Sequence, residues 1–193
     1  MESPAREEII PTAPQRRRAL IKKMDALMAE GKSCVSCTGI CCTFLSNSMQ
    51  ITPLEAMDLK QWLITQGRWN TALFAQLTQT VRRFRLDQDL GDGRRSIRRT
   101  YTCPFYTPGA KGCSISRHHK PYGCLAFNAK APGISAGGNC ASDQSVLSKR
   151  EEQFPVEENR NKQLVKQYSL LFHKAPIPVA LLALADNSQE PKL

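Results

Sequence analysis

Four of the chain's eight cysteines lie within nine residues, and this clustering is the strongest constraint that the sequence places on the structure. The segment from Ser33 to Thr43 reads S-C-V-S-C-T-G-I-C-C-T, and its cysteines are Cys34, Cys37, Cys41 and Cys42. A Cys-x-x-Cys step places two thiolates across one tight turn, close enough to hold a single ion. Successive side chains diverge in most backbone conformations, so we expect Cys41 and Cys42 to serve different partners. The segment therefore predicts two metal sites or one polynuclear centre.

The other four cysteines are distributed through a stretch that is rich in proline and glycine. They are Cys103, Cys113, Cys124 and Cys140. Between residues 100 and 140 we expect irregular loops with one helical turn. Few apolar residues anchor these loops, and metal coordination would supply part of the free energy that orders them. All eight cysteines together form the predicted ligand pool.

Length and composition are those of one ordinary domain. The chain has 193 residues, and with 41% of them hydrophobic it can build a core without cross-links. Met1 to Gln15 lacks the apolar region of a signal peptide, and no stretch has the ~18 apolar residues of a membrane span. These features predict a cytoplasmic protein without a membrane partner. In a reducing cytosol clustered cysteines favour metal ligation, whereas a secreted chain would form four disulfides.

Helical periodicity predicts a mainly α-helical fold. We expect five helices: 15–31, Thr52 to Gln66, Leu73 to about Asp87, 155–174 and 179–185. We also expect a short strand within 44–51. Thr52-Pro53-Leu54-Glu55 carries a capping box with proline at the first helical position. The predicted domain covers residues 15–186, between a flexible arm at 1–14 and a flexible tail at 187–193. In it, helices surround a loop-rich, cysteine-ligated metal centre.

The chain is strongly basic. Lys and Arg number 27 and Asp and Glu 17, which gives a formal net charge of +10. The middle of the chain contains Arg82, Arg83, Arg85, Arg94, Arg95, Arg98 and Arg99. Such a surface favours acidic partners, nucleic acid or anionic small molecules without choosing among them. No aromatic residue is interleaved between Arg94 and Arg99, so a solubilising face or an anion pocket explains that run as well as a nucleic-acid patch does.

Short motifs around the cysteines follow a recognisable order. They are Cys34-x-x-Cys37, Cys41-Cys42, Ile51-Thr52-Pro53-Leu54-Glu55-Ala56, Cys103-Pro104-Phe105, Gly112-Cys113-Ser114-Ile115 and Lys120-Pro121-x-x-Cys124-x-x-Phe127. From Ser33 to Cys140 this order resembles the YkgJ-type cysteine-cluster family, described as a zinc- or iron-chelating domain. The resemblance implies metal or iron-sulfur binding. It also extends to the flagellin lysine methylase, which shares the cysteine pattern and is described as using a cluster with S-adenosylmethionine.

The nature of the metal stays open between iron and zinc. Eight thiolates would make two four-coordinate zinc sites, one iron-sulfur cluster with additional cysteines, or two clusters. The dense cysteine loop resembles cluster-binding loops, and Cys103 and Cys124 each have a nearby proline, so we favour iron. His118 and His119 would be able to complete a mixed site, and we interpret them as polar loop residues.

Three functions follow from these features. The first is a cytoplasmic metal-binding protein that holds an iron-sulfur cluster, iron or zinc through its cysteines. The second is a cluster-dependent protein-modifying enzyme such as a lysine N-methylase, which would require S-adenosylmethionine. The third is a nucleic-acid-binding module that uses the region from Arg82 to Arg99. The sequence assigns no catalytic residue. The partner of the protein would be a protein substrate or another acidic molecule.

Overall fold

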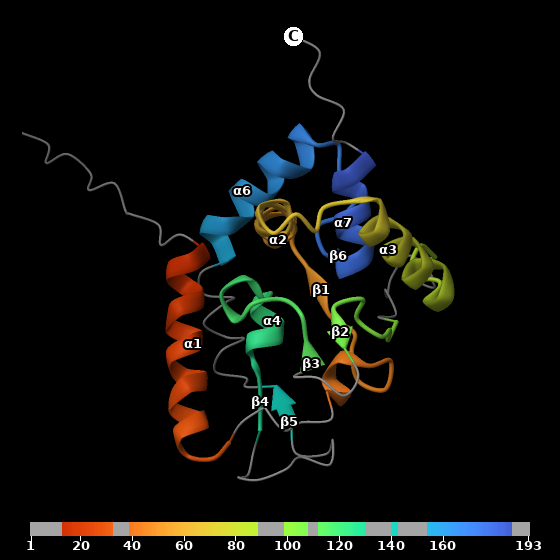
Figure 1. Cartoon of the computed structure of the whole chain (residues 1–193). Coiled ribbons are helices and arrows are strands. Elements are labelled where there is room, and N and C mark those ends of the chain that lie inside the picture. The colour runs from red at the N-terminus through yellow and green to blue at the C-terminus, as the bar shows by residue number, and fades with distance from the viewer. Residues whose placement is uncertain are drawn as a thin grey trace, which may run out of the picture.

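The computed structural model of the chain describes residues 13–32, 39–88, 99–107, 112–129, 140–142 and 154–186. This part of the chain is mainly helical (Figure 1). Its longer helices are α1 (Ala13–Ala29), α2 (Pro53–Thr65), α3 (Thr71–Phe84), α6 (Phe154–Gln167) and α7 (Ile177–Asp186). The short helix α4 (Tyr122–Leu125) lies beside α1 and follows a 3-10 turn at Arg117–His119. The predicted mainly α-helical class is therefore confirmed.

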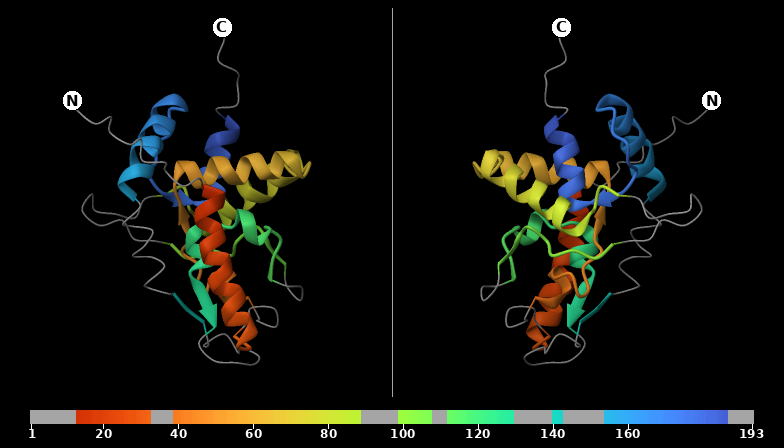
Figure 2. Two further views of the ribbon diagram at one scale, coloured as in Figure 1. Left: turned by 90° about the vertical axis from the view of Figure 1, so that its left-hand side faces the viewer. Right: turned by 90° about the vertical axis from the view of Figure 1, so that its right-hand side faces the viewer.

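The apolar core lies where α2, α3 and α7 meet. Leu59 and Leu63 of α2, Leu77 of α3 and Leu181 and Leu184 of α7 are fully buried. The two views of Figure 2 show α7 crossing α2 and α3, and α7 packs against both of these helices. Helix α6 covers α2 from another side. Burial of these leucines is the main stabilising contribution in this half of the molecule.

Helix α2 begins at the predicted capping box. The Glu55 amide donates to Thr52 Oγ1 at 3.3 Å, and the Thr52 amide donates to Glu55 Oε2 at 2.9 Å. A third free amide, that of Leu54, donates to Asn161 Oδ1 of α6 at 2.9 Å. Three backbone donors that the first helical turn leaves unpaired are thus satisfied by side chains. The last of these bonds also fixes α6 against the start of α2.

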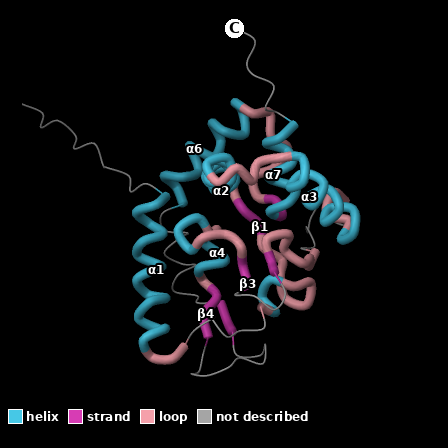
Figure 3. Tube along the Cα trace, viewed as in Figure 1, coloured by secondary structure: helices cyan, strands magenta, loops and turns pink. Residues whose placement is uncertain are grey.

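Within the described ranges, six short strands form three separate antiparallel pairs, shown in magenta in Figure 3. They are β1 (Gln50–Ile51) with β6 (Ala175–Pro176), β2 (Tyr106–Thr107) with β3 (Gly112–Cys113), and β4 (Phe127–Ala129) with β5 (Cys140–Ser142). The described parts of residues 100–140 are thus more regular than predicted. Strand pairing supplies the backbone order there that proline and glycine content alone did not indicate.

Two element boundaries differ from the predictions. The strand expected within 44–51 is confined to Gln50–Ile51, because the amides of Ser46 and Asn47 both donate to the Thr43 carbonyl in a turn. The helix expected to reach residue 174 ends at Gln167, where Ser169 takes a φ of 48° before β6. At the N-terminus α1 already begins at Ala13, inside the predicted arm. The rest of that arm, residues 1–12, and the tail 187–193 lie outside the described residues.

Tyr101 connects three segments through one buried side chain. Its hydroxyl donates to the Met49 carbonyl at 2.7 Å and accepts from the Ile177 amide at 3.1 Å, at the start of α7. Asn47 adds a further bond, from its side-chain amide to the Tyr101 carbonyl at 3.0 Å. Tyr101 itself is completely buried. The backbone that leads to Cys103 is therefore anchored to the helical core.

None of the helices in the described ranges combines the length and the apolar character that crossing a bilayer requires.

Removal of the Tyr101 hydroxyl tests this anchor. We expect Tyr101→Phe to lower the free energy of unfolding by about 1–3 kcal/mol, because a buried amide and a buried carbonyl each lose a partner. Urea unfolding followed by circular dichroism measures the change. Tyr168→Phe is the matched control, since the Tyr168 hydroxyl makes no hydrogen bond to any described residue. Equal losses in both variants would contradict the assigned role.

Candidate metal centre

Five of the eight predicted ligands have side chains that the structure describes. They are Cys41, Cys42, Cys103, Cys113 and Cys124, and none of them is in a disulfide. Cys34 and Cys37 lie outside the described residues, and only the backbone of Cys140, on β5, is described. The five thiols come from four separate segments of the chain. The geometry of those segments therefore decides whether the thiols meet.

Cys42 and Cys103 are joined directly through their backbones. The Cys103 amide donates to the Cys42 carbonyl at 2.8 Å, although 60 residues separate them in sequence. A 3-10 turn at Ile40–Cys42 begins after Gly39, which has a φ of 72°. A Cβ atom on Gly39 would overlap the ring of Tyr106. Glycine is required at this position both for the left-handed backbone and for the close approach of Tyr106.

A clamp on the β2–β3 hairpin positions Cys113. Tyr106 pairs with Cys113 across the hairpin, and the Tyr106 amide donates to the Cys103 carbonyl at 3.0 Å. Arg68, which follows α2, donates from both terminal nitrogens to the carbonyl and the hydroxyl of Ser114, each at 2.9 Å. Its guanidinium also lies 5.4 Å from the centre of the Trp62 ring. The residue next to Cys113 is thereby tied to α2.

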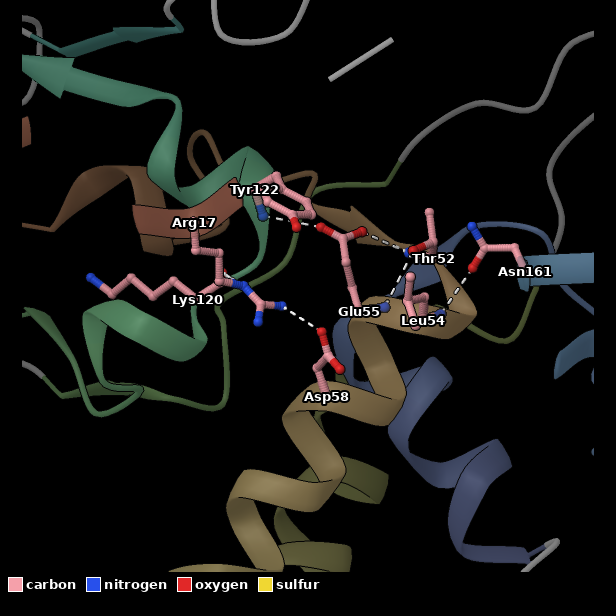
Figure 4. Close-up of polar contacts among 8 residues, drawn as sticks. All are labelled: Arg17, Thr52, Leu54, Glu55, Asp58, Lys120, Tyr122 and Asn161. Atoms are coloured by element: carbon pink, nitrogen blue, oxygen red, sulfur yellow. Dashed lines mark hydrogen bonds and ion pairs between the residues drawn. The ribbon is translucent and has the colours of Figure 1, made fainter. Parts of the chain in front are cut away.

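Glu55 ties α4, which carries Cys124, to the start of α2 (Figure 4). Its Oε1 accepts from the Tyr122 amide at 3.0 Å, while its Oε2 closes the capping box with Thr52. Glu55 is only 2% exposed. Gly123 packs closely beside it, since a Cβ there would lie 2.5 Å from the sulfur of Met49 and the end of that side chain would have to shift. One buried carboxylate thus satisfies a donor on each of two elements.

Arg17 docks α1 against the same region, as Figure 4 also shows. Its Nε donates to the Lys120 carbonyl at 3.1 Å, and its Nη2 pairs with Asp58 Oδ2 at 3.2 Å. The guanidinium lies 5.4 Å from the centre of the Tyr122 ring. With 2% exposure Arg17 is a buried cation, and these partners offset its desolvation. The buried Arg17 therefore fixes both sides of the turn before α4.

The cysteine thiols interact electrostatically as one group. Burial raises the pKa of Cys103 to about 12, and the charges of Cys113 and Cys41 contribute in the same direction. Burial also raises the pKa of Cys124 well above its ordinary value, with Cys103 and Cys113 as further causes. A hydrogen bond with Cys42 is the main cause that raises the pKa of Cys41. Because Cys103 is affected by the charges of Cys113 and Cys41, and Cys124 by those of Cys103 and Cys113, these thiols lie near one another.

The donor chemistry of this group fits a soft metal. Thiols are the ligands of structural zinc and of iron-sulfur clusters, and a bound cation would reverse the mutual disfavour of their charged forms. Within the described ranges, however, no three Cys, His, Asp or Glu side chains stand close enough together to hold one ion. The described thiols thus do not surround a single point.

His118 and His119 are placed differently from each other. His119 Nδ1 lies 2.7 Å from Ser116 Oγ, and its ring stacks on Trp62 with 5.3 Å between ring centres. His118 is exposed. The sequence did not indicate the stack of His119 on Trp62. It also missed the anchors Arg17 and Arg68, because nothing local distinguishes these two arginines from the many exposed ones.

No protein-family model, no curated protein and no solved structure matches this chain. The likeness to the YkgJ-type family therefore stays a prediction from the cysteine motifs.

The two hydrogen bonds of Glu55 predict a marked effect of Glu55→Gln. A glutamine keeps one acceptor oxygen and presents an NH₂ group to the other amide donor. We expect a loss of about 1–3 kcal/mol in the free energy of unfolding, measured by urea denaturation. Glu158→Gln is the control, because the Glu158–Lys162 ion pair is largely exposed and is worth at most about 1 kcal/mol. A change no larger than that of the control would contradict the bridging role.

The environment of His119 predicts a pH dependence. Burial lowers the pKa of His119, with the charges of Arg17 and His118 as further causes and that of Asp58 opposing them. An unfolded imidazole, with a pKa of about 6.5, therefore takes up a proton before the folded one does as pH falls. The stability associated with neutral His119 is complete above that pH and is lost as pH falls through the lower folded value.

Urea midpoints on either side of that pH measure this loss. His119→Gln should reduce the difference between the midpoints at high and low pH, because it removes the titrating group. His173→Gln, which changes an exposed histidine, should leave the difference as it is in the wild-type protein. An unchanged difference in His119→Gln would show that other groups account for it.

Proposed function

We propose that this protein binds a metal through its clustered cysteines, as an iron-sulfur cluster or as iron or zinc ions. The proposal rests on the contact between the Cys42 and Cys103 segments, whose backbones share a hydrogen bond of 2.8 Å, and on the pKa of Cys103, which burial and then the charges of Cys113 and Cys41 raise. Cys34, Cys37 and Cys140 complete the proposed ligand pool.

Core packing alone does not explain this arrangement. A free buried cysteine behaves as a small apolar side chain, and one or two of them in a core need no further reason. Here three of the four thiol-bearing segments have a polar anchor of their own: Tyr101 before Cys103, Arg68 beside Cys113 and Glu55 beside Cys124. Polar anchors of this kind fix the positions of the neighbouring backbone segments. Metal ligands require such fixed positions, whereas cysteines that only fill an apolar core do not.

Iron is favoured over zinc by the surroundings of the thiols. Pro104 follows Cys103 directly, and the Cys124 amide donates to the Pro121 carbonyl at 2.9 Å. Buried aromatic rings at Tyr101, Phe105 and Tyr122 keep water from this side of the group. A bound iron-sulfur cluster would supply electron transfer or substrate activation, whereas zinc would act as a structural cross-link. A cytoplasmic location and methyl transfer with S-adenosylmethionine stay predictions from the sequence and its resemblance.

Metal analysis tests the proposal directly. Protein purified without oxygen and without a histidine tag should contain stoichiometric metal, determined as iron, zinc and acid-labile sulfide per chain. Iron with sulfide and an absorption band near about 400 nm identifies a cluster, and zinc without colour identifies a structural site. The double variant Cys103→Ser/Cys124→Ser should lose most of the metal. Its thermal midpoint should then no longer rise when metal is present, because ligand binding stabilises only a competent native state.

A matched control separates ligand loss from damage to the core. Ala126→Ser introduces a hydroxyl at a buried position two residues after Cys124 and removes no thiol. It should lower stability while leaving the metal content per folded chain unchanged. Metal-free protein from anaerobic purification would overturn the proposal. So would a Cys103→Ser/Cys124→Ser variant with the metal content of the wild-type protein.

A further inference from the structure

An exposed surface next to the Cys41-Cys42 pair combines apolar and basic side chains. We call it the Phe44–Arg83 surface, and it consists of Phe44, Leu45, Arg82, Arg83 and Phe84. Phe44 is 51% exposed and Leu45 is 65% exposed. In Figure 1 the end of α3 lies at the right of the molecule, above the orange segment that contains Phe44 and Leu45. Contiguous exposed apolar side chains that are rimmed by polar groups are a feature of interaction sites.

This surface has a defined structure. The rings of Phe44 and Phe84 stack with 6.4 Å between their centres, and Arg83 lies 5.4 Å from the centre of the Phe84 ring. The Phe44 amide donates to Thr102 Oγ1 at 3.2 Å, which fixes the turn beside the strand-like segment before Cys103. Phe44 is thus held by both its ring and its backbone. Leu45, the next residue, therefore belongs to an ordered turn and is exposed to solvent.

A shallow open groove extends the surface along α3. Its described lining consists of Ala75, Thr78, Gln79, Arg82 and Arg83. The two arginines are therefore shared between the groove and the apolar pair.

The positive charge of the surface is not compensated within the described part of the chain. Arg82, Arg83 and Arg85 are all exposed, and none of them forms an ion pair with a described acidic residue. Arg85 is the C-cap of α3, with a φ of 52°, and adds a third exposed arginine to this end of the helix. The protein as a whole carries a formal charge of +10. An occupant with carboxylates would therefore gain attraction at this site without competing with internal ion pairs.

We propose that the Phe44–Arg83 surface is the docking site of an acidic protein partner. Arginine and phenylalanine are enriched in protein interfaces, where arginines pair at the rim and apolar groups are buried at the centre. The Phe44 ring is already stacked on Phe84, and the more exposed Leu45 has no ring on which a base would stack, so the composition favours a protein over a nucleic acid. Docking here places the partner three residues from Cys42. The proposal goes beyond metal binding and does not depend on it.

Fluorescence anisotropy of the full-length protein tests the proposal with a labelled synthetic peptide in which Asp and Glu alternate with Leu and Phe. The wild-type protein should bind this peptide at low salt and bind it more weakly as salt rises. Arg82→Gln/Arg83→Gln should weaken binding about five- to tenfold at low salt. Leu45→Gln should weaken it about threefold or more, with the salt dependence unchanged, because it removes apolar contact only.

A matched variant controls for net charge. Arg18→Gln/Lys22→Gln removes two positive charges from exposed positions of α1, and binding should change less than about twofold because α1 lies outside the surface. All substituted positions are exposed, so circular dichroism should show unchanged thermal midpoints. Equal losses in the two double variants would overturn the proposal, as would failure of the wild-type protein to bind the peptide at low salt. Tighter binding of a single-stranded RNA oligonucleotide, lost in Arg82→Gln/Arg83→Gln, would assign the surface to nucleic acid instead.

Discussion

The position of α4, the helix that carries Cys124, depends on the buried carboxylate of Glu55. Its two oxygens accept from the Thr52 amide of α2 and from the Tyr122 amide of α4, elements that are 70 residues apart in sequence. A buried carboxylate without partners would be very unfavourable, so both amide donors have to stay in place. This requirement transmits the position of α2, which is set by the leucine core, to the helix that carries Cys124. The Glu55 carboxylate thereby positions α4, whose residues lie outside the leucine core.

The segments that carry Cys103, Cys113 and Cys124 are each held by polar contacts of their own. These contacts are made within the protein and do not involve a metal. Tyr101, Arg68 and Glu55 act on different segments, and Arg17 fixes the turn that leads into α4. Burial raises the pKa values of Cys103 and Cys124, and the charges of other thiols raise them further. A soft cation would offset that cost of ionisation. The scaffold and the donor set therefore have the complementary properties that a metal centre needs.

The proposed centre and the proposed docking surface share one short segment. Residues 39–46 place Cys41 and Cys42 towards Cys103 and then present Phe44 and Leu45 to solvent. The amides of Cys42 and Thr43 donate to the carbonyls of Gly39 and Ile40, and Phe44 is held by Thr102 and Phe84. A partner on the exposed side would thus contact the same ordered turn that carries two of the proposed ligands.

The sequence by itself determined the features that depend on neighbouring residues. The capping box fixed the start of α2 at Thr52, apolar periodicity gave the helical class, and the spacing of the cysteines singled out the region of the candidate site. The tertiary structure alone decided contacts between distant residues: Glu55 with Tyr122, Arg17 with Asp58, and Cys42 with Cys103. Local pattern carries no information about these pairs, because an arginine that will be buried, such as Arg17, looks the same in sequence as exposed Arg18 beside it. Apart from β1, which lies within the predicted 44–51, the short strands escaped prediction for a related reason, since two-residue pairs form only where the fold brings their partners together.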